Sequence, residues 1–213
     1  MSKVKVFIVG SIGTCQYAHM FRSEGFEKTY NSNEADLVCF TGGSDVSPHL
    51  YGEGKHPLTG NSLQRDEVES EWFNVFKAQG IPMVGVCRGG QFLNVMCGGK
   101  LYQHVNNHAI GGTHGLLDLP TGKRWAVTST HHQMMRVGAE GTLIGQSDGT
   151  CATVKEYVSE GKVVDDAGYS NVDVEVVAYP ESNVLCFQPH PEFEEGECRE
   201  YFFTLVYKLL GDK

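Results

Sequence analysis

The sequence lacks the features that would place it among membrane, repeat or low-complexity proteins. Its 213 residues contain no apolar run of roughly 18 residues, the length that a membrane-spanning helix needs. No repeat period is present, and no Pro-, Ser- or Gly-rich linker divides the chain. We therefore expect one domain over residues 1–213 without membrane association, in which residues 3–9 form a first strand and not a signal peptide.

Basic residues and paired cysteine motifs are also scarce. Lys and Arg number 17 against 26 Asp and Glu, and the net charge of −9 is poorly suited to binding a phosphate backbone. Direct binding of nucleic acid is therefore not expected. The seven cysteines include no C-x-x-C pair, and several lie in apolar runs, where buried free thiols are common. Without a secretion signal, this cysteine usage indicates the reducing cytoplasm.

No standard metal-binding frame is present either. His104, His108 and His114, with Cys97 nearby, form a conceivable zinc set in a Gly- and Asn-rich stretch. Their spacing matches neither a zinc finger nor an H-E-x-x-H helix, and loops commonly carry scattered histidines. We therefore expect no metal and no cofactor.

Short β-branched runs alternate with helical segments along the chain, which favours an α/β fold around a mostly parallel sheet. A Gly- and Thr-rich stretch at residues 111–149 adds short strands to this pattern. The expected strands are residues 3–9, 36–40, 81–86, 125–129, 172–178 and 183–188, and the expected helices are 67–79, 91–96 and 197–210.

The segment from Gly85 to Gly89 has the pattern of a nucleophile elbow, with Cys87 at the position that serine often takes. Such a strand-to-helix turn strains its central residue, and the flanking glycines remove Cβ atoms that would collide. The N-terminus of the following helix then favours the thiolate, which is the reactive form of cysteine. Cys87 is thus the candidate nucleophile. The alternative is a small buried residue in a Gly-rich turn.

A nucleophilic cysteine needs a base, and His190 with Glu192 in QPHPEF is the candidate pair. Imidazole titrates near neutral pH and can move a proton between the thiol and a leaving amine. A carboxylate on its other ring nitrogen fixes the tautomer. Taken alone, His190 is equally well a surface histidine. Combined with the elbow, it is the expected general base.

At this point the sequence resembles a known family. GVCRGGQFLN and QPHPE are similar to the Cys-His-Glu motifs of class I glutamine amidotransferases, and GGSDVSPHLYGE resembles the signature of gamma-glutamyl-gamma-aminobutyrate hydrolases in the peptidase C26 group. QRDEVE, GGKLYQHV and VTSTHHQ agree, so the resemblance covers roughly residues 36 to 193. It implies a three-layer, flavodoxin-like sandwich with a central, mostly parallel sheet. Hydrolases of this group are usually longer, so the amine half of the substrate is the least defined feature.

The resemblance also implies a role for each site residue. Cys87 attacks the carbonyl of a γ-glutamyl amide, His190 acts as base and then acid, and Glu192 orients His190. The backbone N–H groups of Gly43 and Arg88 form the oxyanion hole. The glutamyl group is held by Gln91, His132 and Gln133.

Three functions stay open at this stage. A stand-alone hydrolase would cleave glutamine or another γ-glutamyl amide through a thioester on Cys87. A glutaminase subunit would deliver ammonia to a separate synthetase chain, since no G-x-x-x-x-G-K-[ST] loop occurs here. The third is a non-catalytic or metal-binding regulatory relative. A homodimer is compatible with each.

Neighbouring residues carry further expectations. At most one of His131 and His132 can face a pocket if both lie on a strand. Asp45 is either a turn former or a pocket residue. Arg65 and Asp66 are expected to be a helix-start pair without a catalytic role.

Overall fold

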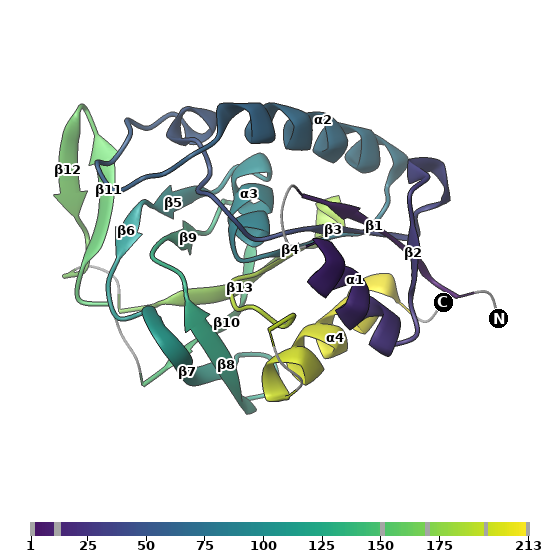
Figure 1. Ribbon diagram of the computed structural model, residues 1–213. Coiled ribbons are helices and arrows are strands. Elements are labelled where there is room, and N and C mark those ends of the chain that lie inside the picture. The colour runs from purple at the N-terminus through teal and green to yellow at the C-terminus, as the bar shows by residue number, and fades with distance from the viewer. Residues whose placement is uncertain (1–2, 11–13, 150–151, 169–170, 194–195, 212–213) are drawn as a thin grey trace.

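A nine-stranded sheet forms the centre of the protein in a computed structural model that describes residues 3–10, 14–149, 152–168, 171–193 and 196–211 (Figure 1). The strand order is β2-β1-β3-β4-β14-β13-β10-β7-β8. In that order the strands span Glu27–Thr29, Lys5–Val9, Leu37–Phe40, Met83–Val86, Val184–Phe187, Val174–Tyr179, Thr142–Asp148, Ala109–Asp118 and Arg124–Thr130.

The sheet has a parallel half and an antiparallel half. Strands β2, β1, β3, β4 and β14 pair in parallel, whereas β13, β10, β7 and β8 extend the sheet by antiparallel pairing. Strands β3, β4 and β14 are buried at every position, as expected for parallel strands that are covered on both faces. The loops at the carboxyl ends of these three strands share one edge of the sheet, where α/β proteins place their sites.

Helices cover both faces of the sheet (Figure 1). Helices α2 and α3 pack on one face through Phe73, Phe76 and Phe92, and α1 and α4 pack on the other through Phe21 and Phe202. The four helices span Thr14–Ser23, Leu63–Gln79, Arg88–Met96 and Glu197–Leu210. The expected three-layer α/β sandwich is confirmed.

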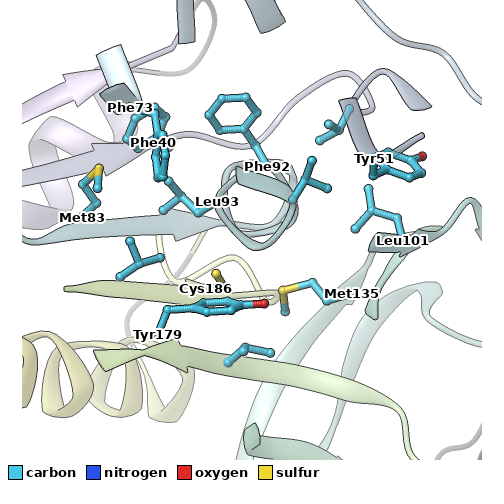
Figure 2. Packing of buried hydrophobic residues seen from close by; sticks show 14 of the residues in the cluster. Phe40, Tyr51, Phe73, Met83, Phe92, Leu93, Leu101, Met135, Tyr179 and Cys186 are labelled. Carbon is cyan, nitrogen blue, oxygen red and sulfur yellow. The ribbon is translucent and has the colours of Figure 1, made fainter. Parts of the chain in front are cut away.

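The core encloses helix α3 (Figure 2). Every position from Arg88 to Val95 is buried. Phe92 stacks on Phe40 of β3 with 5.6 Å between the ring centroids, and the Tyr179 hydroxyl of β13 donates a hydrogen bond to Asn94 Oδ1 (2.7 Å). Truncating a buried side chain of this size costs about 3–5 kcal/mol. The helix that follows Cys87 is therefore fixed from all sides.

Smaller elements complete the described ranges. Two short sheets contain β12-β11-β6 and β5-β9. These strands span Lys162–Asp165, Lys155–Ser159, His104–Val105, Lys100–Tyr102 and Met134–Arg136, and the 3-10 turns span Ser32–Glu34, Pro48–Tyr51 and Pro180–Ser182. No helix in the described ranges combines the length and the apolar character needed to cross a membrane.

The expected elements are present, with shifts at their ends. The helix expected at 197–210 has those bounds, whereas α2 begins four residues earlier than expected, at Leu63. Ser62 caps it there by accepting a hydrogen bond from the Arg65 N–H (3.4 Å). The sequence does not predict helix α1, and it predicts short strands in the stretch 111–149 without giving the bounds of β7 and β10. The many glycines between residues 111 and 149 obscure the alternation by which strands are recognised.

Candidate active site

Cys87 lies at a strained turn between β4 and α3. Its backbone has φ 51° and ψ −113°, a conformation that non-glycine residues rarely adopt. Its N–H donates to the Phe187 carbonyl (2.7 Å), which ties the turn to β14. Cys87 occupies the N-cap position of α3, where the helix dipole favours a negative charge. The expected nucleophile elbow is therefore present.

Close backbone packing explains the glycines around Cys87. A Cβ on Gly89 would collide with the Phe40 carbonyl of β3, and a Cβ on Gly85 would collide with the backbone of Gly89. Glycine at both positions lets α3 leave the sheet directly beside β3 and β4.

His190 and Glu192 lie beside Cys87. His190 Nδ1 is 2.6 Å from Glu192 Oε1, and because an ionised carboxylate only accepts, Nδ1 donates and Nε2 faces away from Glu192. A Cβ on Gly42 would lie 2.8 Å from His190 Cε1 and 3.7 Å from Cys87 Cβ, so the imidazole and the thiol flank the same point. Burial lowers the pKa of His190, but the charge and hydrogen bond of Cys87 and the Glu192 carboxylate outweigh it and raise that pKa to about 10. This favours the imidazolium form of His190.

The loop after β3 carries the backbone group expected in the oxyanion hole. Gly43 has φ 137°, which strongly favours glycine, and it lines the same cavity as Arg88. Arg88 is the first residue of α3, where backbone N–H groups have no intrahelical acceptor. Arg65 holds the loop by donating to the carbonyls of Gly42 (3.0 Å) and Thr41 (2.8 Å).

A buried ionic network connects this loop to the elbow. Arg65 Nε donates to Glu69 (2.7 Å), and the Arg88 side chain pairs with both Glu69 and Asp66. Asp66 also accepts a hydrogen bond from the Ser47 N–H (3.0 Å). Arg65 and Asp66 therefore do more than begin a helix, because they fasten α2 to both sides of the candidate oxyanion hole.

A cavity of about 320 Å³ opens beside Cys87. All the residues expected to bind the glutamyl group or to form the oxyanion hole line it. It is lined by Gly43, Ser44, Asp45, Leu58, Gly60, Cys87, Arg88, Gln91, Thr130, His131, His132 and Gln133.

Asp45 and His132 form a hydrogen-bonded pair on the wall of this cavity. His132 Nε2 lies 3.1 Å from Asp45 Oδ1, and this hydrogen bond raises the pKa of His132 despite its partial burial. Asp45 Oδ2 accepts from the Gly60 N–H (2.7 Å). Asp45 is thus a pocket residue that also braces a loop.

Gln91 and Gln133 form the inner wall. The Gln91 amide donates to the Gln133 carbonyl (3.1 Å) and to Gln188 Oε1 (3.2 Å), and the Gln133 amide donates to the Gln103 carbonyl (3.0 Å). Both side chains are buried, so these hydrogen bonds keep the wall in one arrangement.

Sequence comparisons agree with this geometry. The Peptidase C26 family matches residues 24–115. The Lactococcus lactis protein YvdE, assigned as a glutamine amidotransferase-like protein, is 31% identical over 180 residues, which are 83% of this chain and 73% of YvdE. The chain belongs to the class I glutamine amidotransferase-like family.

Other relatives show how far the similarity extends. NtpR of Enterococcus hirae is 38% identical over 101 residues, but these are 47% of this amidotransferase-like chain and only 36% of NtpR. The chain therefore matches about a third of that relative's length. A solved structure from Thermoplasma acidophilum, assigned as one subunit of a GMP synthase, aligns over 99% of this chain and 95% of its own with a TM-score of 0.65. At 15% identity this likeness supports the amidotransferase-like fold alone.

Tyr17 and Thr128 also contact the candidate triad of this amidotransferase-like chain, and neither contact was expected from its sequence. Burial, and then the neighbouring Glu192, keep the pKa of Tyr17 far above its ordinary value, so its hydroxyl stays neutral. That hydroxyl accepts from the Gly42 N–H (3.0 Å). Thr128 Oγ1 accepts from the His190 N–H (2.6 Å). Tyr17 lies far from every motif in the sequence, whereas Thr128 lies within VTSTHHQ, which does not reveal its contact with His190.

The conceivable zinc set of His104, His108 and His114 does not assemble as one group. His104 stacks on His56 (5.9 Å between centroids) near the pocket, whereas His108 and His114 lie together elsewhere, in a buried cluster with His131. His131 and His132 lie between β8 and β9 and not on a strand, so the alternation expected of a strand does not apply, and both line the cavity. His131 Nδ1 contacts the Gln133 carbonyl, whereas His132 Nε2 contacts Asp45.

Proposed function

We propose that this chain is a cysteine hydrolase that cleaves a γ-glutamyl amide bond through a γ-glutamyl thioester on Cys87. The observation that carries the proposal is the strained backbone of Cys87 at the start of α3, with the His190–Glu192 pair beside it. A small buried cysteine would need neither this strain nor an imidazole with a raised pKa at its side. Family membership supports the same chemistry.

Each group has one task in the proposed mechanism. The Cys87 thiolate attacks the amide carbonyl, and the resulting oxyanion accepts hydrogen bonds from the N–H groups of Gly43 and Arg88. The His190 imidazolium gives its proton to the leaving amine, and the thioester forms as the C–N bond breaks. Neutral His190 then takes a proton from water, which attacks the thioester and releases glutamate and the thiolate. Glu192 holds the imidazole in the required tautomer throughout.

The charges of the pocket suit the amino-acid end of a γ-glutamyl group. This end carries an α-ammonium and an α-carboxylate, which match Asp45 and the cationic form of His132 in the same cavity. Gln91 and Gln133 shape the wall behind them. The proposal therefore assigns the α-ammonium to Asp45 and the α-carboxylate to His132.

The test is amine release from glutamine, γ-glutamyl-GABA and short poly-γ-glutamates, with the Cys87→Ser variant as the blank. Rapid, Cys87-dependent release from one of these amides is the expected result, and it would identify the substrate. Full activity in Cys87→Ser would refute the nucleophile, because a serine hydroxyl is hardly ionised in this setting.

The second candidate is a glutaminase subunit that supplies ammonia to a separate synthetase. It is favoured by the assignment of YvdE, which is 31% identical, as a glutamine amidotransferase-like protein, since an amidotransferase passes ammonia to an acceptor. Weak turnover of all three substrates, with Cys87 still labelled by a glutamine-like electrophile, would support this candidate. Absence of both turnover and labelling would instead indicate a non-catalytic relative.

A further inference from the structure

Three histidines and two carboxylates form a buried cluster behind the wall of the candidate active site. His108 and Asp173 precede β7 and β13, His114 and Glu175 lie on these strands, and His131 follows β8. All five are at most 6% exposed. The rings of His108 and His131 stack at 4.7 Å, and His108 and His114 meet edge-on at 5.2 Å. The triad does not use this cluster.

The outer hydrogen bonds of the cluster determine which ring nitrogens carry protons. His131 Nδ1 lies 2.9 Å from the Gln133 carbonyl, which can only accept, so Nδ1 is the donor. His108 Nε2 lies 2.7 Å from Asp173 Oδ2, and Asp173 is also paired with Lys155 Nζ (2.6 Å), as an ionised carboxylate would be. His108 Nε2 is therefore a donor too. Metal-binding histidines commonly donate in this way to a carboxylate or a backbone carbonyl.

The remaining ring nitrogens point inward at Glu175. His108 Nδ1 lies 3.4 Å and His131 Nε2 lies 3.5 Å from Glu175 Oε1, and neither nitrogen has a hydrogen bond with any described residue. One ligand atom from each of these three residues can be chosen so that all lie within 4.8 Å of one another. Tetrahedral ligands about 2.0–2.1 Å from a zinc ion are separated by about 3.4 Å, close to the two measured distances.

The charges of the cluster also call for a cation. Lys155 balances Asp173, whereas the ionic contacts of Glu175 among the described residues are made with histidines alone. Two nitrogen lone pairs facing a carboxylate oxygen repel one another in a buried site unless a positive charge lies between them.

We propose that His108 Nδ1, His131 Nε2 and Glu175 bind a divalent transition-metal ion of the Zn²⁺ class. Two imidazoles and a carboxylate are a common zinc ligand set, in which the fourth position goes to water or to the second carboxylate oxygen. His114 Nε2 lies 3.0 Å from Glu175 Oε1 and orients that carboxylate. Asp173 and the Gln133 carbonyl orient the two imidazoles.

The ion would be structural and would stabilise the wall beside Cys87. It would join β13 to the segments that flank β7 and β8. The Gln188 N–H donates to the Glu175 carbonyl (2.8 Å), and the Gln188 amide donates to Cys87 Sγ (3.6 Å). The Gln133 carbonyl, which accepts from His131, also accepts from Gln91 in the pocket. This inference does not depend on the reaction proposed above.

The test measures metal binding in the full chain carrying Cys87→Ser, which removes the reactive thiol as a competing ligand. The protein is stripped with a chelator, and Zn²⁺ is titrated in competition with a chromophoric chelator. We expect one equivalent per chain, a higher melting temperature with the ion, and a Co²⁺ spectrum without a thiolate charge-transfer band. Glu175→Gln and His108→Ala should lose this equivalent, whereas the exposed-histidine variants His19→Ala and His49→Ala should keep it.

Three results would overturn the proposal. The first is a stripped chain that binds no stoichiometric Zn²⁺, which would mean that a proton on one imidazole supplies the cation. The second is a thiolate band in the Co²⁺ spectrum. The third is an unchanged stoichiometry in Glu175→Gln. Because the first two measurements need no change in the cluster, they decide the question even if the cluster variants fail to fold.

Discussion

At the scale of single residues, the hydrogen bond between His190 and Glu192 (2.6 Å) gives the two side chains different tasks. His190 carries the proton, and Glu192 orients His190. Glu192→Gln keeps the imidazole in place but weakens its orientation, whereas His190→Ala removes the proton carrier. We expect Glu192→Gln to retain about 10²-fold more activity than His190→Ala, as in other triads. Single-turnover rates of acylation on the substrate identified above measure the difference. Equal losses in the two variants would mean that Glu192 does more than orient the base.

The Asp45–His132 pair predicts how the substrate's two α-substituents are distinguished. Removing the carboxylate in Asp45→Asn should raise KM for a γ-glutamyl substrate about 10-fold or more, because a charge-assisted hydrogen bond to the α-ammonium is lost. A glutaryl amide lacks that ammonium and should show no such change. Steady-state kinetics with both substrates test this. A similar rise in KM for both substrates would mean that Asp45 acts only by holding the loop through its hydrogen bond with the Gly60 N–H.

Residues of the site could be predicted where the chemistry lies in one short segment. The elbow around Cys87 and the His190–Glu192 pair are contiguous motifs, so the sequence marks them together as candidates. Tyr17 and the His108–His131–Glu175 cluster come from segments that only the folded sheet brings together. No local pattern shows which of these residues meet.

At the scale of elements, the close contact between α3 and β3 predicts a large effect of one methyl group. Gly89→Ala would push its Cβ into the Phe40 carbonyl and should destabilise the fold by about 1–3 kcal/mol. Gly112→Ala on β7 is the matched control, since no atom lies within 4 Å of its added Cβ, and it should change stability by less than about 0.5 kcal/mol. Urea unfolding gives both values. Comparable stabilities would show that α3 can shift away from β3.

The buried ionic network between α2 and α3 predicts that removing one charge destabilises the fold more than removing a pair of opposite charges. Arg88→Met leaves the buried Asp66 without its ionic partner, while Glu69 keeps Arg65, and it should cost about 3–5 kcal/mol. Adding Asp66→Asn to Arg88→Met should recover part of that loss, because Arg65 and Glu69 then balance each other. Lys5→Met removes one partner of the exposed Lys5–Glu34 pair and should have no measurable effect. If the double variant is no more stable than Arg88→Met, the buried charge of Asp66 is not the cause.

Elements were predictable from sequence in the parallel half of the sheet but less so beyond it. Strands β3, β4 and β14 are short apolar runs followed by glycine or proline motifs, and α4 is regularly amphipathic. Strand β7 contains Gly111, Gly112 and Gly115 and is exposed over its first half, so its alternation is weak. Its place in the sheet depends on long-range pairing with β8 and β10.

At the scale of the whole molecule, two buried groups should limit stability at opposite ends of the pH range. Burial raises the pKa of Glu175, but His131 and His114 outweigh it and lower that pKa to about 2, from about 4.5 in the unfolded chain. Between these values the unfolded chain binds more protons, so this contribution is present above about pH 4.5 and is lost as the pH falls towards 2. His190 behaves in the opposite way. Its pKa is about 10 when folded and 6.5 when unfolded, so its contribution is complete below 6.5 and is lost as the pH rises through 10.

Stability should therefore be greatest between about pH 4.5 and 6.5 and should decline from pH 6.5 to 8.5, before most thiols and tyrosines of the unfolded chain ionise. Urea midpoints across this range, measured with a chelator present so that no metal contributes, test the profile. The decline should be smaller in Cys87→Ser, because the charge that raises the pKa of His190 is then absent. Glu175→Gln should keep the alkaline decline and lose part of the acid one. A wild-type stability that rises between pH 6.5 and 8.5 would contradict the raised pKa of His190.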